Sequence, residues 1–330
     1  MRIFKTKTPD SLFTSSSKIV ELAKAFAATL TDDQHRDLNQ HYSLRNAVNW
    51  SNLPQNLLGR RRRRGLRVGT LSGKQWTALN ALLSAATGSS KNNGYDEIQQ
   101  ILNADDHLRD NGGGSDYGRE NFYVSFLGAP SDYGKWELQF GGHHLAVANT
   151  YINGALVGAT PSFRGIEPFS TFEYNGVNNQ PQQQAQSAFE ALLTSFDDGQ
   201  LAVARLSDKY SDVLLGPGKD WAFPNTVTGI RGSELRVSQR ALLLAAIKTY
   251  VSSVDDENAA RILAGYEGEL DSTYVGYSCS KSMSKARDYI RIDGPSVWIE
   301  FSMRCGIIFS DPHPHAVWRD KNTDYGGTAP

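Results

Sequence analysis

The sequence predicts an α+β protein in which two related helix-plus-hairpin halves contribute strands to one central, mostly antiparallel sheet. Segments with apolar residues at helical spacing precede segments rich in β-branched and aromatic residues. This order occurs twice along the 330 residues. Hydrophobic residues make up 39% of the chain and charged residues 21%, values typical of globular proteins rather than of disordered or membrane proteins.

The first third of the chain is predicted to be helical. Apolar residues recur at helical spacing over 15–30. Residues 31–34 match the capping box, in which a Thr side chain and a Gln side chain satisfy each other's backbone amides, so a second helix begins there. Residues 72–75 repeat this box before a helix that should end near Gly88. A shorter amphipathic segment follows at 95–102.

Strand patterns begin after these helices. The runs 122–126 and 136–140 are rich in aromatic and β-branched residues, and the loop between them contains Gly, Pro and Asp, so they predict a hairpin. The polar segment 175–186 is the best candidate for a linker. A helix over 184–196 should follow it.

Two parts of the chain also resemble each other in sequence. Gly65–Arg67, Leu71, Gln75 and Leu79 align without gaps with Gly229–Arg231, Leu235, Gln239 and Leu243. The hairpin 122–140 similarly resembles 289–301. We therefore expect a single domain over 1–330 that contains duplicated halves, 15–170 and 182–327, related by a pseudo-two-fold axis. The alternative is chance recurrence, because helix starts and hairpins share the same chemistry everywhere.

Two histidine pairs are the candidate metal ligands. Alternate residues of a strand share a face, so an extended His313-Pro314-His315 directs both imidazoles to one side. In His143-His144 we expect adjacent strand residues to point oppositely, and we favour His144 as the ligand. Three imidazoles suit zinc, copper or iron, although no HExxH spacing supports the assignment. The alternative is a metal-free histidine cluster that is hydrogen-bonded around a buried carboxylate.

Polar residues beside the second pair are the candidate catalytic groups. A carboxylate would complete or orient the ligand set, and the candidates are Glu300, Glu137, Asp320 and Asp324. Arg319 would bind an anionic substrate, and Tyr325 would donate a proton. The alternatives are an Arg319–Asp320 ion pair that pins the loop and a Tyr325 that only caps the pocket.

Two further segments receive structural interpretations. Residues 160–168 contain Arg164 and Glu167, which could line the same pocket, but we expect an ordinary surface loop. The basic run Arg60 to Arg64 lacks interleaved aromatic residues and the net charge is −1, so a solvated loop or a surface for an acidic partner is favoured over nucleic-acid binding. The two cysteines, Cys279 and Cys305, are expected to be reduced thiols.

The motifs GGHHLA, TPSFRG and HPHAVWRDKNTDYGG occur in this order and resemble a family called domain of unknown function 3500. The resemblance covers nearly the whole chain and implies one family domain. It implies no activity. The positions that fall on the family's signature are His143, His144, His313, His315, Arg319, Asp320, Asp324 and Tyr325.

The leading functional prediction is a metal-dependent enzyme that is hydrolytic by default, with copper-type redox chemistry as a variant. One alternative is a binding module for a metal or a small anionic ligand. Another is a metal-free acid–base enzyme using His315, Arg319 and Tyr325. We expect a small, anionic substrate, no nucleic-acid or membrane partner, and a cytoplasmic location, or a secreted or periplasmic one if a leader is removed, since relatives begin with such a leader.

Overall fold

A twelve-stranded sheet forms the centre of the protein in the computed structural model, which describes residues 11–58 and 63–327. Neighbouring strands are antiparallel except for β1 and β3, so the predicted α+β class with a mostly antiparallel sheet is confirmed. A separate hairpin pairs β8 with β9. The strands are β1 (Asn39–Gln40), β2 (Leu66–Arg67), β3 (Tyr123–Leu127), β4 (Lys135–Gly142), β5 (Leu145–Ile152), β6 (Ala155–Gly158), β7 (Ser162–Gly165), β8 (Phe172–Tyr174), β9 (Val177–Asn179), β10 (Ile230–Arg231), β11 (Tyr274–Ser278), β12 (Tyr289–Asp293), β13 (Val297–Cys305) and β14 (Pro312–Asp320).

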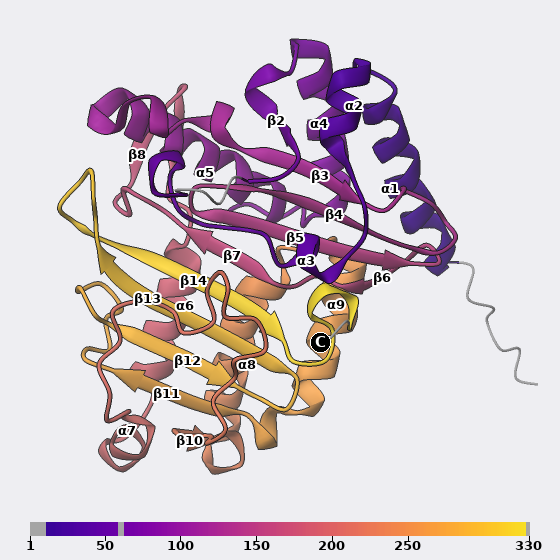
Figure 1. The fold of residues 1–330 in the computed structure, drawn as a ribbon. Coiled ribbons are helices and arrows are strands. Elements are labelled where there is room, and N and C mark those ends of the chain that lie inside the picture. The colour runs from indigo at the N-terminus through magenta and orange to yellow at the C-terminus, as the bar shows by residue number, and fades with distance from the viewer. Residues whose placement is uncertain (1–10, 59–62, 328–330) are drawn as a thin grey trace, which may run out of the picture.

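The larger helices cover one face of this sheet, the upper strands being backed by the N-terminal helices and the lower strands by the C-terminal ones, whereas the short α3 lies on the opposite face, where the carbonyl of Ala47 accepts a hydrogen bond from Gln139 (Figure 1). The larger helices pack their buried apolar residues into one continuous core with the strands. The helices are α1 (Ser11–Ala27), α2 (Asp32–Leu38), α3 (Leu44–Ala47), α4 (Gly73–Ala86), α5 (Gly94–Leu108), α6 (Gln183–Thr194), α7 (Asp198–Ala204), α8 (Val237–Val251) and α9 (Asp256–Gly268).

The helix starts predicted from capping boxes are confirmed. Thr31 accepts a hydrogen bond from the amide of Gln34, and the Gln34 side chain accepts one from the Thr31 amide at 3.0 Å. Ser72 and Gln75 form the same reciprocal pair at the start of α4. Both boxes satisfy amides that the first turn of a helix leaves without partners. The segment predicted over 95–102 is a longer helix, α5, because its buried face continues to Leu108.

Two expectations about connecting segments are wrong. The candidate linker 175–186 contains β9 and is partly buried: Asn179 has no exposed surface and accepts a hydrogen bond from Asn103 of α5 at 2.9 Å. The expected surface loop 160–168 contains the buried central strand β7. Arg164 of this strand is buried against Glu97, which supplies the charge partner that burial requires.

The middle of the sheet is the contact between β7 and β14, where His315 to Trp318 pair with Gly165 to Ser162. Outward from it, β5, β4 and β3 follow on one side, and β13, β12 and β11 follow on the other. The hairpin 122–140 therefore occupies the place that corresponds to β11 and β12. The sequence comparison instead equated it with 289–301, which forms β12 and β13. That expectation is wrong by one strand, because all hairpins share the same alternating pattern.

The second face of the sheet carries polar side chains. Ala316 and Trp318 of β14 point into the helix-covered core, whereas Val317 points the other way and packs with Phe163 and Trp50. Strand alternation places His313, His315 and Arg319 on the side of Val317. The irregular segments 48–58 and 206–229 pass over this face and enclose its polar groups.

No helix within residues 11–58 and 63–327 is both long and apolar enough to cross a membrane. Cys279 and Cys305 are both free thiols, as expected. Of the basic run, Arg60 to Arg62 lie outside the described residues.

Candidate metal centre

Three histidines converge at the middle of the polar sheet face. One ring nitrogen from each of His144, His313 and His315 lies within 4.8 Å of the other two. All three side chains are buried, with 3 to 5% of each residue exposed. The Nε2 atoms of His144 and His315 are 3.2 Å apart. Two nitrogens bound to one tetrahedral ion at 2.0–2.1 Å would be about 3.4 Å apart, so this spacing fits a shared metal.

His144 reaches this point from the tight turn between β4 and β5. The turn consists of His143 and His144, and His144 has a φ of +62°, a left-handed conformation unlike that of a strand. The expectation that the two side chains point oppositely as in a strand is therefore wrong: their rings stack with centroids 3.7 Å apart. Gly165 leaves room for the His144 ring, since a Cβ there would lie 2.9 Å from its Cδ2.

His313 and His315 come from the start of β14, as the extended His-Pro-His pattern predicts. The carbonyl of Pro314 accepts a hydrogen bond from Ile166 on the β7 side of the strand. Pro314 has no N–H to donate on this side. Because β7 ends at Gly165, no hydrogen bond between the strands is lost there. The two imidazoles flank Pro314 on the face that its ring leaves free.

Asp212 orients His315. Its Oδ1 lies 2.9 Å from His315 Nδ1, which leaves the Nε2 directed at the cluster. Arg304 holds the other carboxylate oxygen at 2.7 Å. A carboxylate that binds the remote nitrogen of an imidazole is the usual support for a metal-ligating histidine.

His143 has a different role from the other three histidines. Its Nδ1 lies 2.5 Å from Asp105 of α5, and it is absent from the convergent group. The second oxygen of Asp105 accepts the Gly118 amide at 2.9 Å. His143 thus forms a buried wall that stacks on His144 and connects the turn to the end of α5.

The environment favours uncharged imidazoles in the cluster. Burial, followed by the neighbouring histidines, holds the pKa of His144 well below its usual range. Burial and then His315 lower the pKa of His313 to about 3. Burial also lowers the pKa of His315, while the hydrogen bond with Asp212 acts in the opposite direction. Since metals bind the neutral form of imidazole, these groups are ready for a cation at neutral pH.

One polar atom in the cluster lacks a partner. The Nδ1 of His313 is buried without a hydrogen bond to any residue within the described part of the chain. A buried polar group is normally satisfied, and one that is not calls for an explanation. The donor set and this nitrogen both fit a bound transition metal.

Glu300 does not join the histidines. Its carboxylate accepts hydrogen bonds from the amides of Leu214 and Leu215, from Tyr289 Oη and from Trp298 Nε1, at 2.6 to 2.9 Å. These donors occupy both oxygens, so Glu300 anchors the segment 206–229 to the sheet. Its expected role beside the metal is wrong, because both carboxylate oxygens already accept hydrogen bonds from these donors and none comes from a histidine of the cluster.

Arg319 and Tyr325 form a separate buried network. The guanidinium of Arg319 donates to Asp220 and Asp324 at 2.9 and 3.0 Å and to the carbonyls of Leu215 and Gly216. Tyr325 donates to Asp220 at 2.5 Å. Every N–H of Arg319 has an acceptor and its side chain is 1% exposed, so none remains for a substrate anion. No hydrogen bond or ion pair joins Arg319 to the histidines among the residues that the structure describes.

The expected Arg319–Asp320 ion pair is also wrong, because adjacent strand residues point to opposite faces. Asp320 lies on the helix-covered side, where Tyr266 donates to its Oδ2 at 2.7 Å. Its Oδ1 accepts the amides of Asn322 and Thr323, which closes the turn after β14. Asp320 and Asp324 are therefore structural carboxylates in this arrangement.

Sequence reasoning missed the two carboxylates that hold the histidines, Asp105 and Asp212. Asp105 carries a usable signal, since an acidic residue on the buried face of an amphipathic helix needs a partner. Asp212 lies in an irregular segment whose path no periodic pattern predicts.

The fold and the site define a class: an α+β protein with a buried three-histidine group at the middle of its sheet. The chain belongs to the family described as protein of unknown function (DUF3500), whose model matches residues 14–327. This confirms the family resemblance noted in the sequence. No curated protein and no solved structure matches the chain.

Proposed function

We propose that the protein is a metal-dependent enzyme that holds one divalent transition metal through His144, His313 and His315. The observation that carries the proposal is the convergence of three buried imidazole nitrogens within 4.8 Å. Three protein ligands leave a coordination position open for a substrate or water, as in catalytic rather than closed structural zinc sites. When bound, the metal supplies Lewis acidity for hydrolysis of an ester, amide or similar bond, or redox chemistry if it is copper.

The protein's own residues would prepare the site. Asp212 would fix the tautomer of His315, and Asp105 would hold His143 against His144. Burial keeps the imidazoles neutral, which is the form that binds a metal. The ligand chemistry suits zinc, copper or iron.

Elemental analysis of protein purified without a histidine tag tests the proposal. We expect about one equivalent of zinc, copper or iron per chain after reconstitution. The double variant His313→Ala/His315→Ala should lose it, and His35→Ala/His41→Ala, which removes two histidines outside the cluster, should keep it. Metal-free wild type after exposure to all three ions would refute the proposal. Full occupancy without turnover of ester, amide or oxidisable substrates would favour a metal-binding module instead.

We also propose that the two halves arose by duplication, which would explain why the site lies at their junction. Matching hydrogen bonds support this. Gln75 donates to Gln34 at 2.8 Å and to the carbonyl of Thr29 at 2.9 Å. Gln239 donates to Gln200 at 2.8 Å and to the carbonyl of Ser195 at 2.7 Å.

Matching glycines support it as well. Gly65 and Gly229 have φ values of +108° and +118°. A Cβ at these positions would lie 2.5 Å from the carbonyl oxygen of Val124 and 2.3 Å from that of Val275. Only glycine fits both places, which precede β2 and β10. The strand order outward from the contact between β7 and β14 supports the same relationship.

A further inference from the structure

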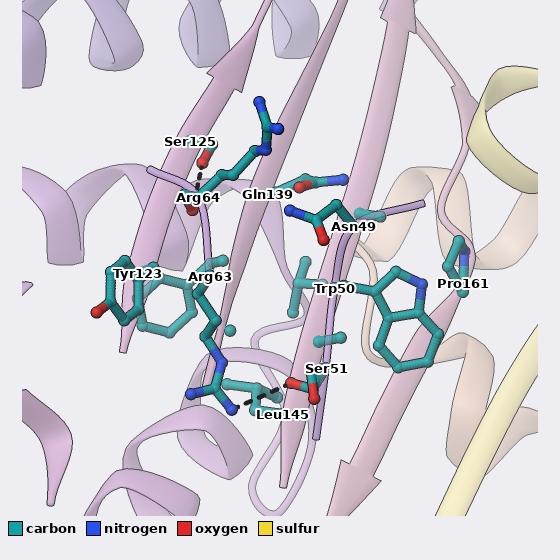
Figure 2. A pocket seen from close by; sticks show the side chains of 15 residues that line it. Asn49, Trp50, Ser51, Arg63, Arg64, Tyr123, Ser125, Gln139, Leu145 and Pro161 are labelled. Carbon is teal, nitrogen blue, oxygen red and sulfur yellow. Dashed lines mark hydrogen bonds between the residues drawn. The ribbon is translucent and has the colours of Figure 1, made fainter. Parts of the chain in front are cut away.

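A hollow on the polar face of the sheet lies beside the metal centre but outside it. Figure 2 shows it between the irregular segments 49–51 and 63–64 and the strands β3, β4 and β5. Phe163 separates the two sites: its ring packs 6.1 Å from the ring of Trp50, which lines the hollow, and 5.3 Å from that of His315. We call this hollow the Arg63 pocket.

The floor of the Arg63 pocket is mostly apolar, because Gly141, Ala146 and Ala148 lie there and Gln139 is the polar residue among them. Gly141 pairs with Ala146, and Gln139 pairs with Ala148, so their side chains share this face. The small residues leave unfilled a space that larger side chains would occupy. Trp50 adds an aromatic wall (Figure 2).

Arg63 brings a positive charge to this apolar space, and none of the described residues is its counter-ion. Its Nη1 donates to Gln55 at 3.2 Å, and its Nη2 donates to the carbonyls of Ser51 and Leu53. All these acceptors are neutral, and no carboxylate within the two described ranges forms an ion pair with Arg63. Its Nε is buried without an acceptor there. A charge that is largely removed from water and unpaired is costly unless an anion joins it.

Two other features agree with an anionic occupant. Burial lowers the pKa of Arg63 to about 10, against the opposing effect of Asp105, as expected for a guanidinium whose charge is poorly compensated. Arg64, whose carbonyl accepts a hydrogen bond from Ser125 at 3.1 Å, carries its exposed guanidinium to another side of the same hollow (Figure 2). Of the two expectations for the basic run, the solvated loop does not hold for Arg63, whose side chain is largely buried.

We propose that the Arg63 pocket binds an organic acid with a flat apolar body, its carboxylate at Arg63 and its body between Trp50 and the alanine floor. A carboxylate suits this site better than a phosphate, because the Nη atoms already donate to the protein and few donors remain for a dianion. The proposal goes beyond the metal-dependent function and does not depend on it.

Calorimetric titration of the whole chain in EDTA tests the proposal with naphthalene-2-carboxylate as the probe. We expect saturable binding of one equivalent, at least about tenfold weaker binding of neutral naphthalene-2-methanol, and none of the naphthylmethylammonium cation. Equal affinity for all three probes, or no binding of the carboxylate, would overturn the proposal.

Two variants locate the binding. Ala148→Leu fills the floor and should abolish binding, while Arg63→Met should weaken it at least about tenfold. Because Arg63 also holds the segment 51–53, thermal unfolding must first show that its variant is folded. Arg36→Met, the same charge change on the surface of α2, should leave binding unchanged. Undiminished binding by folded Ala148→Leu would place the probe elsewhere and refute the pocket.

Discussion

The Nε2 atoms of His144 and His315 lie 3.2 Å apart, although 171 positions separate the two residues in the chain. One belongs to the turn between β4 and β5, and the other to β14 beyond the middle of the sheet. Two neutral imidazoles at this distance share at most one hydrogen. A cation bound by both, and by His313, would tie the two sides of the sheet together.

Metal should therefore stabilise the fold. With free zinc about a thousandfold above its Kd, we expect the free energy of unfolding to rise by about 4 kcal/mol relative to protein in EDTA, because the unfolded chain has no preformed site. Urea titrations measure the difference. His313→Ala/His315→Ala should show no such gain, whereas His35→Ala/His41→Ala should show it in full. A gain that persists in the first variant would place the stabilising metal at another site.

Asp212→Asn should weaken metal binding about 10- to 100-fold, because the amide no longer fixes the tautomer and orientation of His315 as the carboxylate does. Competition with a chromophoric chelator measures the affinity. Asp208→Asn, on the same segment but exposed, is the matched control and should bind like wild type. Equal affinity of both variants would mean that Asp212 has no part in the centre.

The metal-free protein should lose stability in mild acid. The pKa of His313 falls from 6.5 to about 3 on folding, so the unfolded chain takes up the proton first. Stability from the neutral ring is fully present above about pH 6.5 and is lost as the pH falls towards 3. Between pH 6.5 and 5 this amounts to about 2 kcal/mol.

Urea unfolding in EDTA at several pH values checks this prediction. His313→Gln should flatten the pH dependence, whereas His35→Gln, outside the cluster, should not. An unchanged slope in His313→Gln would show that His313 does not resist protonation in the folded protein.

Arg319 should matter for stability rather than for metal binding. Arg319→Met leaves Asp220 and Asp324 buried without their shared cation and should lower the free energy of unfolding by about 3–5 kcal/mol. Arg36→Met removes an exposed pair with Asp33 and should cost less than about 1 kcal/mol. Where Arg319→Met still folds, its affinity for zinc should match wild type. A large loss of zinc affinity in the folded variant would show that Arg319 contributes to the metal site.

The proposed duplication predicts equal costs at equivalent positions. Gln75→Ala and Gln239→Ala each remove a buried amide that joins two helices, and each should destabilise the protein by about 1–3 kcal/mol. The two effects should add in the double variant, because the sites lie in different halves. Chemical denaturation measures all three. A loss confined to one position would argue against equivalent roles.

Local chemistry accounts for what could be predicted. The boxes at Thr31 and Ser72 predicted two helix starts, since side chain and backbone partners lie three residues apart. The His-Pro-His pattern predicted a shared face because strand alternation is a property of the backbone itself. Both inferences need only neighbours in the chain.

What could not be predicted depends on tertiary contacts. The turn at His143 and His144 was mistaken for a strand because two histidines carry no turn signal of the Asn-Gly kind. The partner of Arg319 was assigned to Asp320 by proximity in sequence, while Asp220 arrives from a segment without regular structure. Asp212 reaches His315 in the same way.

The contact between β7 and β14 spans only four residue pairs, yet it lies next to all three converging histidines. A small rotation at so short a junction would change the distance between nitrogens carried on its opposite sides. Metal affinity would then depend on how the two sides of the sheet are oriented relative to each other. A substitution far from the histidines could therefore be detected as a change in metal affinity or in the absorption spectrum of the bound ion.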